Sequence, residues 1–149
     1  MNGFVWFRNL LVVMLVLAAM VMSGAGTALA ATETGTGTIQ AQGVGVAALR
    51  GSGDVTIGRG AGTVWVSGTA QIQTEGTGRR TTLPDGTIRL TGYTGKIVIS
   101  GEAITVRVAG GAITLTATGT GSVFLKGKGS YTVNATSGTW SRDGAVVPF

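Results

Sequence analysis

The six carboxylates are the first candidates for chemistry in this sequence, because the chain contains no His and no Cys. Without those residues there are no disulfides, thiolate nucleophiles, imidazole bases or zinc sites of the usual kind. Glycoside hydrolysis needs two carboxyl groups about 5–10 Å apart, whereas Asp54, Asp85 and Asp143 stand beside Gly as typical turn residues. We therefore predict no catalytic residue, no metal site and no cofactor, and a small carboxylate-dependent hydrolase is the weakest of three functional hypotheses. The acids are Glu33, Asp54, Glu75, Asp85, Glu102 and Asp143.

Two aromatic residues and three cations form a second group with binding chemistry. Trp65 and Phe124 each stand between two apolar residues, so in a strand they point away from the core. An outward aromatic ring can stack on a sugar or anchor an interface. The candidate ligand or interface contacts are Trp65, Phe124, Arg79, Lys126 and Lys128. They support a carbohydrate- or polyanion-binding module. We predict no nucleic-acid partner, because basic and aromatic residues do not interleave along the sequence as they do in single-strand binders.

Short strands must position these residues, because apolar and polar side chains alternate in runs separated by Gly. The chain has 27 Gly, a residue that costs about 1 kcal/mol per helical position relative to Ala. Alternation with a period of two, bounded by Gly, is typical of half-buried strands. We therefore predict a glycine-rich, all-β domain. The expected strands lie at 55–57, 64–66, 70–73, near 79–83, 88–90, 97–99, 104–108, 113–117, 123–125 and 131–133.

Two architectures fit this rhythm. Turn signals at Leu83–Thr87 and Ser141–Gly144, with a hairpin at Gly110-Gly111, favour an antiparallel sandwich or a small barrel. The alternative is a parallel β-solenoid with three strands per coil, which would stack Val64 over Leu90. The sequence leaves both open.

The N-terminal region predicts export. A short positive segment, a 13-residue apolar run at 10–22 and the small residues Ala28-Leu29-Ala30 predict a signal peptide over 1–30, cleaved after Ala30. We expect a flexible or weakly stranded segment at 31–49 and a single all-β domain at 50–149. The predicted location is secreted or cell-surface, with the periplasm as an alternative. Membrane association is expected only if the signal stays uncleaved as an anchor.

One stretch resembles a known class. The run from Arg50 to Ile57, followed by Gly60–Val64, is similar to the Gly-Ser-Gly-Asp units of exported bacterial adhesin-like head domains. The resemblance implies a β-solenoid without enzymatic activity. Our leading hypothesis is a non-catalytic structural or adhesive β domain at the cell surface. Its expected partners are envelope polysaccharide or copies of itself.

Overall fold

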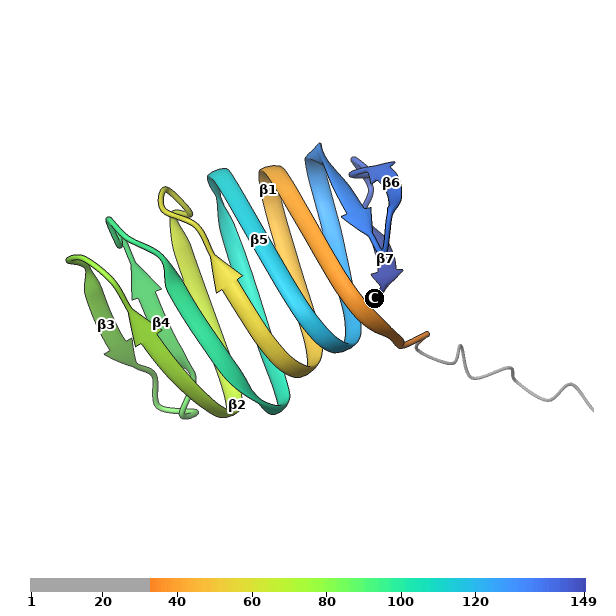
Figure 1. Cartoon of the computed structure of the whole chain (residues 1–149). Helices are drawn as coiled ribbons and strands as arrows, with labels where there is room; N and C mark the ends of the chain where they lie inside the picture. Colours follow the sequence, from red (N-terminus) through yellow and green to blue (C-terminus); the bar gives the residue numbers. More distant parts are fainter. Residues whose placement is uncertain (1–32) are drawn as a thin grey trace, which may run out of the picture. The chain divides into compact units, whose positions relative to one another are not determined.

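The computed structural model describes residues 33–149 (Figure 1), so the predicted signal peptide lies outside the described residues. The described residues form strands and turns, which confirms the all-β prediction. They contain no helix long and apolar enough to cross a membrane. The strands are β1 (Gly35–Ile57), β2 (Thr63–Thr74), β3 (Arg79–Thr82), β4 (Ile88–Thr91), β5 (Ile97–Val133), β6 (Thr136–Thr139) and β7 (Ala145–Pro148).

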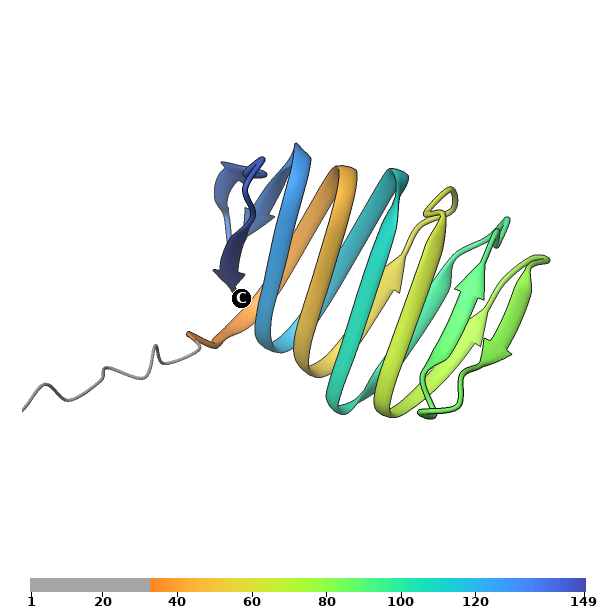
Figure 2. The same cartoon turned by 180° about the vertical axis from the view of Figure 1, so that it is seen from behind.

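Most of the domain is one long antiparallel hairpin wound on itself. The first arm contains β1, β2 and β3, and the second contains β4 and β5, with the tip of the hairpin at Leu83–Thr87. Figures 1 and 2 show β1 and β5 winding side by side around a flattened coil, with β3 and β4 at one end and β6 and β7 at the other. Because the hairpin is wound into a coil, each long strand pairs along both edges with other passes of the same hairpin.

The register of β1 and β5 defines the winding. Leu115 of β5 pairs with both Ala41 and Ile57, two β1 residues that are 16 positions apart. Ile39 of β1 likewise pairs with both Ala117 and Val133 of β5. Each arm therefore completes about one turn of the coil between successive contacts with the same partner. All ladders between the named strands are antiparallel.

Facing Gly-x-Gly triplets form the corners of the coil. Gly43–Gly45 lies opposite Gly127–Gly129, and Gly51–Gly53 lies opposite Gly119–Gly121. Gly53 and Gly119 have φ angles of 136° and 147°, which L-residues with side chains rarely adopt. A Cβ at Gly53 would also overlap the Thr118 carbonyl oxygen. The backbone can bend here without leaving the ladder because neither strand carries a side chain at the contact.

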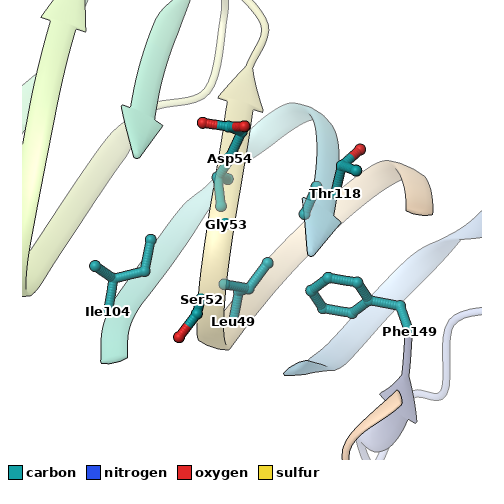
Figure 3. Close-up of a pocket in the computed structure, with 9 residues that line it drawn as sticks. Leu49, Ser52, Gly53, Asp54, Ile104, Thr118 and Phe149 are labelled. Atoms are coloured by element: carbon teal, nitrogen blue, oxygen red, sulfur yellow. The ribbon is translucent and has the colours of Figure 1, made fainter. Parts of the chain in front are cut away.

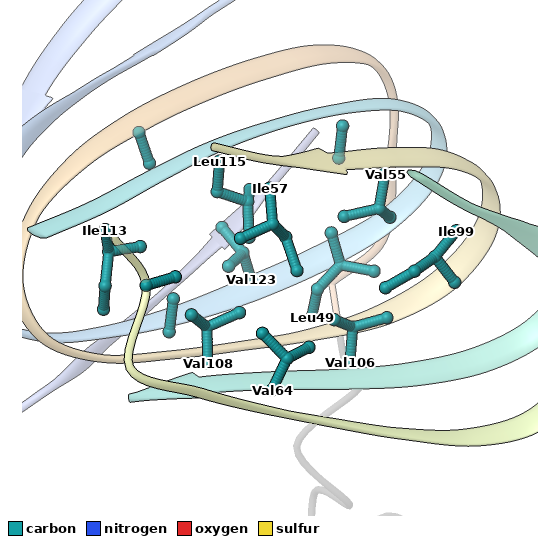
Figure 4. Packing of buried hydrophobic residues seen from close by; sticks show 14 of the residues in the cluster. Leu49, Val55, Ile57, Val64, Ile99, Val106, Val108, Ile113, Leu115 and Val123 are labelled. Atoms are coloured by element: carbon teal, nitrogen blue, oxygen red, sulfur yellow. The ribbon is translucent and has the colours of Figure 1, made fainter. Parts of the chain in front are cut away.

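Between corners the hairpin crosses two stacked layers that enclose the core. Val106 and Val108 point inward from one layer, and Ile113 and Leu115 point inward from the other (Figure 4), as the alternation predicted. Ile104 and Ala117 of the same runs are also buried. Each large apolar side chain buried in this way contributes about 1.5–3 kcal/mol. The largest fully buried side chains are Ile39, Leu49, Ile57, Leu90, Ile99, Ile104, Ile113, Leu115, Leu125, Val64, Val106 and Val108.

The segment at 31–49, which we expected to be flexible or weakly stranded, forms from Gly35 onward the first part of β1. Ile39 and Ala47 are fully buried there, and β5 pairs with both edges of the strand. The alternating runs of this segment gave only a weak strand signal because small residues such as Ala41 and Gly43 occupy many of its positions. In the structure these small residues let neighbouring passes of β5 pack closely. The all-β domain therefore begins well before residue 50.

Other expectations are corrected by the pairing. The sheet is antiparallel, so the parallel solenoid is wrong, and it is not closed into a barrel. Val64 does pair with Leu90, but in an antiparallel ladder. Gly110-Gly111 is not a hairpin turn, because β5 runs through it and Gly110 pairs with Gly45 at a corner. Asp54 is a strand residue of β1 rather than a turn residue.

Two predicted turns are confirmed. In the hairpin between β3 and β4, the N–H of Gly86 donates to the carbonyl of Leu83 at 2.9 Å. Asp85 in this turn accepts hydrogen bonds from the backbone N–H and the hydroxyl of Thr87, and both lower the pKa of its carboxyl group. In the second turn, the N–H of Gly144 donates to the carbonyl of Ser141 at 3.3 Å.

The turn between β5 and β6 contains a strained residue that can be relieved. Asn134 and Ala135 have φ angles of 45° and 80°, the pattern of a hairpin turn that favours Asn followed by Gly. We expect Ala135→Gly to raise the free energy of unfolding by about 0.5–1 kcal/mol, because Gly removes the left-handed penalty of Ala. Urea unfolding measures this. The control, Ala112→Gly in β5, should lower stability by about the same amount, and a loss in both variants would contradict the assigned turn.

Candidate functional site

A row of outward side chains crosses one of the two layers. Trp65 lies between Val64 and Val66, which are buried, so its indole points outward. The register places Arg89 of β4 on one side of Trp65 and Arg107 of β5 on the other. Arg89 and Arg107 also lie between inward apolar residues and share this outer surface. Directly opposed residues on neighbouring strands are close enough to interact, so the three side chains form one cross-strand group.

Further cations flank this row. Arg79 on β3 is a diagonal neighbour of Arg89, and Arg50 on β1 is a diagonal neighbour of Arg107. Lys126 lies on the next pass of β5, opposite Val46. We call this surface the basic face. It consists of Arg50, Arg79, Arg89, Arg107, Lys126 and Trp65.

Among residues 33–149, no carboxylate forms an ion pair with a cation of the basic face. None of the outward strand positions of this layer carries Asp or Glu. Among residues 33–149 the ion pair present joins Lys96 and Glu75 at 3.1 Å, away from this face. Five unpaired cations on one surface create a positive potential that attracts anions over a distance set by the salt concentration.

Trp65 holds one of these cations in place. The Arg107 guanidinium carbon lies over the Trp65 ring, 5.7 Å from its centroid. A guanidinium on an indole face gains about 0.5–1 kcal/mol at an exposed site and keeps its N–H groups available to a ligand. Trp65 therefore orients Arg107, and its own ring face is partly occupied. This differs from the free stacking surface that the sequence suggested.

The other predicted contacts divide into two groups. Arg79 and Lys126 lie on the basic face with Trp65, although they are far apart in sequence. Phe124 has the same outward direction, but a Cβ on Gly144 would overlap its ring, so the turn before β7 covers part of it. Lys128 lies at a corner, opposite Val44. We therefore leave Phe124 and Lys128 out of the basic face.

Sequence reasoning missed Arg50, Arg89 and Arg107. Arg89 and Arg107 were each visible as the outward residue of an alternating run, as in Ile88-Arg89-Leu90. What the sequence could not show is that both strands lie next to β2 in the same layer. The pairing register contains that information, because it places side by side residues that are separated by several turns of the coil along the chain.

The opposite layer has a different chemistry. Its outward side chains are mainly Thr, Ser and Gln, and Asp54 is the charged residue among them. Hydroxyl groups bond across its strands, as between Thr38 and Thr118 at 3.1 Å. Asp54 accepts a hydrogen bond from Ser100 at 2.6 Å. We call this surface the hydroxyl face, and its lack of Lys and Arg makes it a natural internal control for the basic face.

Two hollows in the described part of the chain are each lined by a single carboxylate. An open hollow of about 710 Å³ beside β2 contains one carboxylate, Glu102. A crevice between Leu49, Asp54 and Phe149 is too narrow for a water molecule (Figure 3). Asp54, Glu75 and Asp85 are each engaged by a neighbouring side chain. Residues 33–149 also contain no cluster of three acids that could hold a metal ion.

Among the described residues, the geometry thus offers an array of exposed cations on one layer, of which Arg107 is oriented by Trp65. Such an array can bind anionic groups through charge-assisted hydrogen bonds. No protein-family model, curated protein or solved structure matches this chain.

Proposed function

We propose that this protein is a non-catalytic adhesive module that binds an anionic polymer on its basic face. The observation that carries the proposal is the Arg89–Trp65–Arg107 group with its flanking cations, on a layer without carboxylates. Each exposed charge pair contributes little alone, about 0–1 kcal/mol. A polymer that meets several cations at once gains from their sum, whereas a single small anion does not.

The setting proposed for this activity is the cell surface. The predicted signal peptide at 1–30 supports export, and the rigid β coil without Cys suits an exposed structural domain. Acidic polysaccharides of the cell envelope are the anionic polymers available there. On this account the coil presents its basic face to the polymer, and no bond is made or broken.

A binding assay with heparin tests the proposal, since heparin is a linear polysaccharide with dense negative charge. We expect the protein to bind heparin at low salt and to lose affinity as salt rises, because counterions screen the cations. The double variant Arg89→Ala/Arg107→Ala should bind about tenfold more weakly, since losing two exposed charge contacts of about 0.7 kcal/mol each removes about 1.4 kcal/mol of binding free energy. Isothermal titration calorimetry measures both affinities.

The matched control removes two cations outside the basic face. Arg59 lies in the turn after β1, and Lys96 lies at the corner before β5. Arg59→Ala/Lys96→Ala has the same net charge as the test variant. We expect it to keep heparin affinity to within about twofold. Equal losses in both double variants would show that only net charge matters, and no binding by the unmodified protein would refute the proposal.

A further inference from the structure

The cations of the basic face follow the strands one by one. The layer runs through β3, β4, β2, the 105–109 pass of β5, the 46–50 pass of β1 and the 122–126 pass of β5. Each of these contributes one cation to the basic face except β2, where Trp65 takes the place. The cations in this order are Arg79, Arg89, Arg107, Arg50 and Lys126.

Strand spacing fixes the distance between successive cations along the coil axis. Neighbouring strands lie about 4.8 Å apart, so the five steps from Arg79 to Lys126 span about 24 Å. Arg79 and Lys126 are displaced to one side of the central row by two residues, and Arg50 is displaced to the other side by two residues, in each case about 7 Å along the strand. Long flexible side chains can close most of that displacement.

We propose that the polymer on the basic face is a linear polyuronate that lies along the coil axis, with one acidic sugar per strand. This inference rests on the proposed function and specifies its ligand. In an extended β-1,4-linked pyranose chain, each sugar advances the chain by about one strand spacing. Five of the sugars then place a carboxylate on a strand that carries a cation, and the remaining sugar lies over Trp65 on β2. Five steps correspond to about six sugars.

Oligosaccharides of defined length test the spacing. The probes are β-1,4-linked oligomannuronates of four, six and eight sugars, and a hyaluronan fragment with the same number of carboxylates as the hexamer. Hyaluronan carries an acid on every second sugar. We expect affinity to rise steeply from four to six sugars and little beyond, and the hyaluronan fragment to bind at least about fivefold more weakly. A twelve-residue single-stranded DNA is the third probe and should bind more weakly than the hexamer.

Moving one cation to another strand tests whether hexamer affinity depends on the spacing of the cations or only on net charge. Arg107→Ala/Ala48→Arg shifts the cation to the directly opposed residue on β1 and leaves the 105–109 pass of β5 without one. Arg107→Ala/Thr105→Arg keeps it on the same pass. We expect the first variant to lose at least about fivefold in hexamer affinity, and the second to lose clearly less than the first, because its cation stays on the same pass of β5.

The results distinguish the polyuronate inference from the proposed binding of anionic polymers in general. If heparin binds but hyaluronan equals the hexamer, or both relocated variants bind alike, the polyuronate inference is overturned and anionic-polymer binding stands. Tighter binding of the DNA would also overturn it. If heparin does not bind, the proposed function fails first. Thermal unfolding of each variant confirms that the fold is intact, and Thr105→Arg keeps the test usable if Ala48→Arg misfolds.

Discussion

Replacing Gly53 with Ala is expected to lower the free energy of unfolding by at least about 3 kcal/mol. The φ angle of 136° at Gly53 is unfavourable for Ala, and left-handed conformations cost about 1–2 kcal/mol for residues with a Cβ. The new methyl group would also overlap the Thr118 carbonyl oxygen. Relief would require the two facing Gly-x-Gly triplets to separate, which breaks the ladder between β1 and β5. Urea unfolding measures the loss.

Two other glycines separate the effect of backbone strain from the effect of steric overlap on the stability of Gly53→Ala. Gly111 is exposed and has no atom within 4 Å of a built Cβ, so Gly111→Ala should change stability by no more than about 0.5 kcal/mol. Gly86 has equally open surroundings but a φ of 83°, so Gly86→Ala should cost about 1–2 kcal/mol through strain alone. If Gly53→Ala lowered the free energy of unfolding no more than Gly86→Ala, this result would contradict the close approach of the two facing Gly-x-Gly triplets.

Removing the indole of Trp140 has the second large effect. Trp140 is 6% exposed, lies against the corner glycines Gly43 and Gly129, and donates its N–H to the Ser130 carbonyl at 3.1 Å. We expect Trp140→Ala to cost about 3–5 kcal/mol, because the ring fills the space that these glycines leave. Thermal or urea unfolding gives the value.

Conservative and surface replacements provide the comparison. Trp140→Phe keeps most of the ring packing but loses the hydrogen bond, so a cost of about 1–2 kcal/mol is expected. Trp65→Ala removes a half-exposed indole and should cost less than Trp140→Ala in stability. An equal loss at Trp65 and Trp140 would contradict their different burial in the coil.

Local chemistry was sufficient to predict the alternating strand segments between 55 and 133 and two of the turns. Alternation correctly placed Val64, Val106 and Leu115 inward, and the Pro84-Asp85-Gly86 sequence predicted the hairpin tip. The Gly-x-Gly triplets were misinterpreted as separators between strands. A glycine pair favours a reverse turn and a strand corner equally, and only the facing glycines on another pass decide between them. Their eight-residue repeat, at 43, 51, 119 and 127, was the available signal.

The candidate site could be predicted only in part. The outward direction of Trp65 followed from its neighbours, and Arg79 and Lys126 were identified by charge. Their assembly with Arg107 depends on winding that brings β3 and β5 into one layer, and no local pattern specifies that register. The contact of Phe124 with Gly144 is likewise non-local. For this reason the sequence could not show that the turn before β7 covers part of the Phe124 ring.

The most direct test of whether the basic face binds the anionic polymer is to map ligand contacts by NMR. Amide shifts of isotope-labelled protein would be followed as heparin oligosaccharide is added. We predict shifts centred on the strands of the basic face, at 79–82, 88–91, 63–67, 105–109, 46–50 and 122–126. We also predict little change on the hydroxyl face at 38–42 and 114–118. Shifts on the hydroxyl face, or spread evenly over both faces, would contradict this prediction.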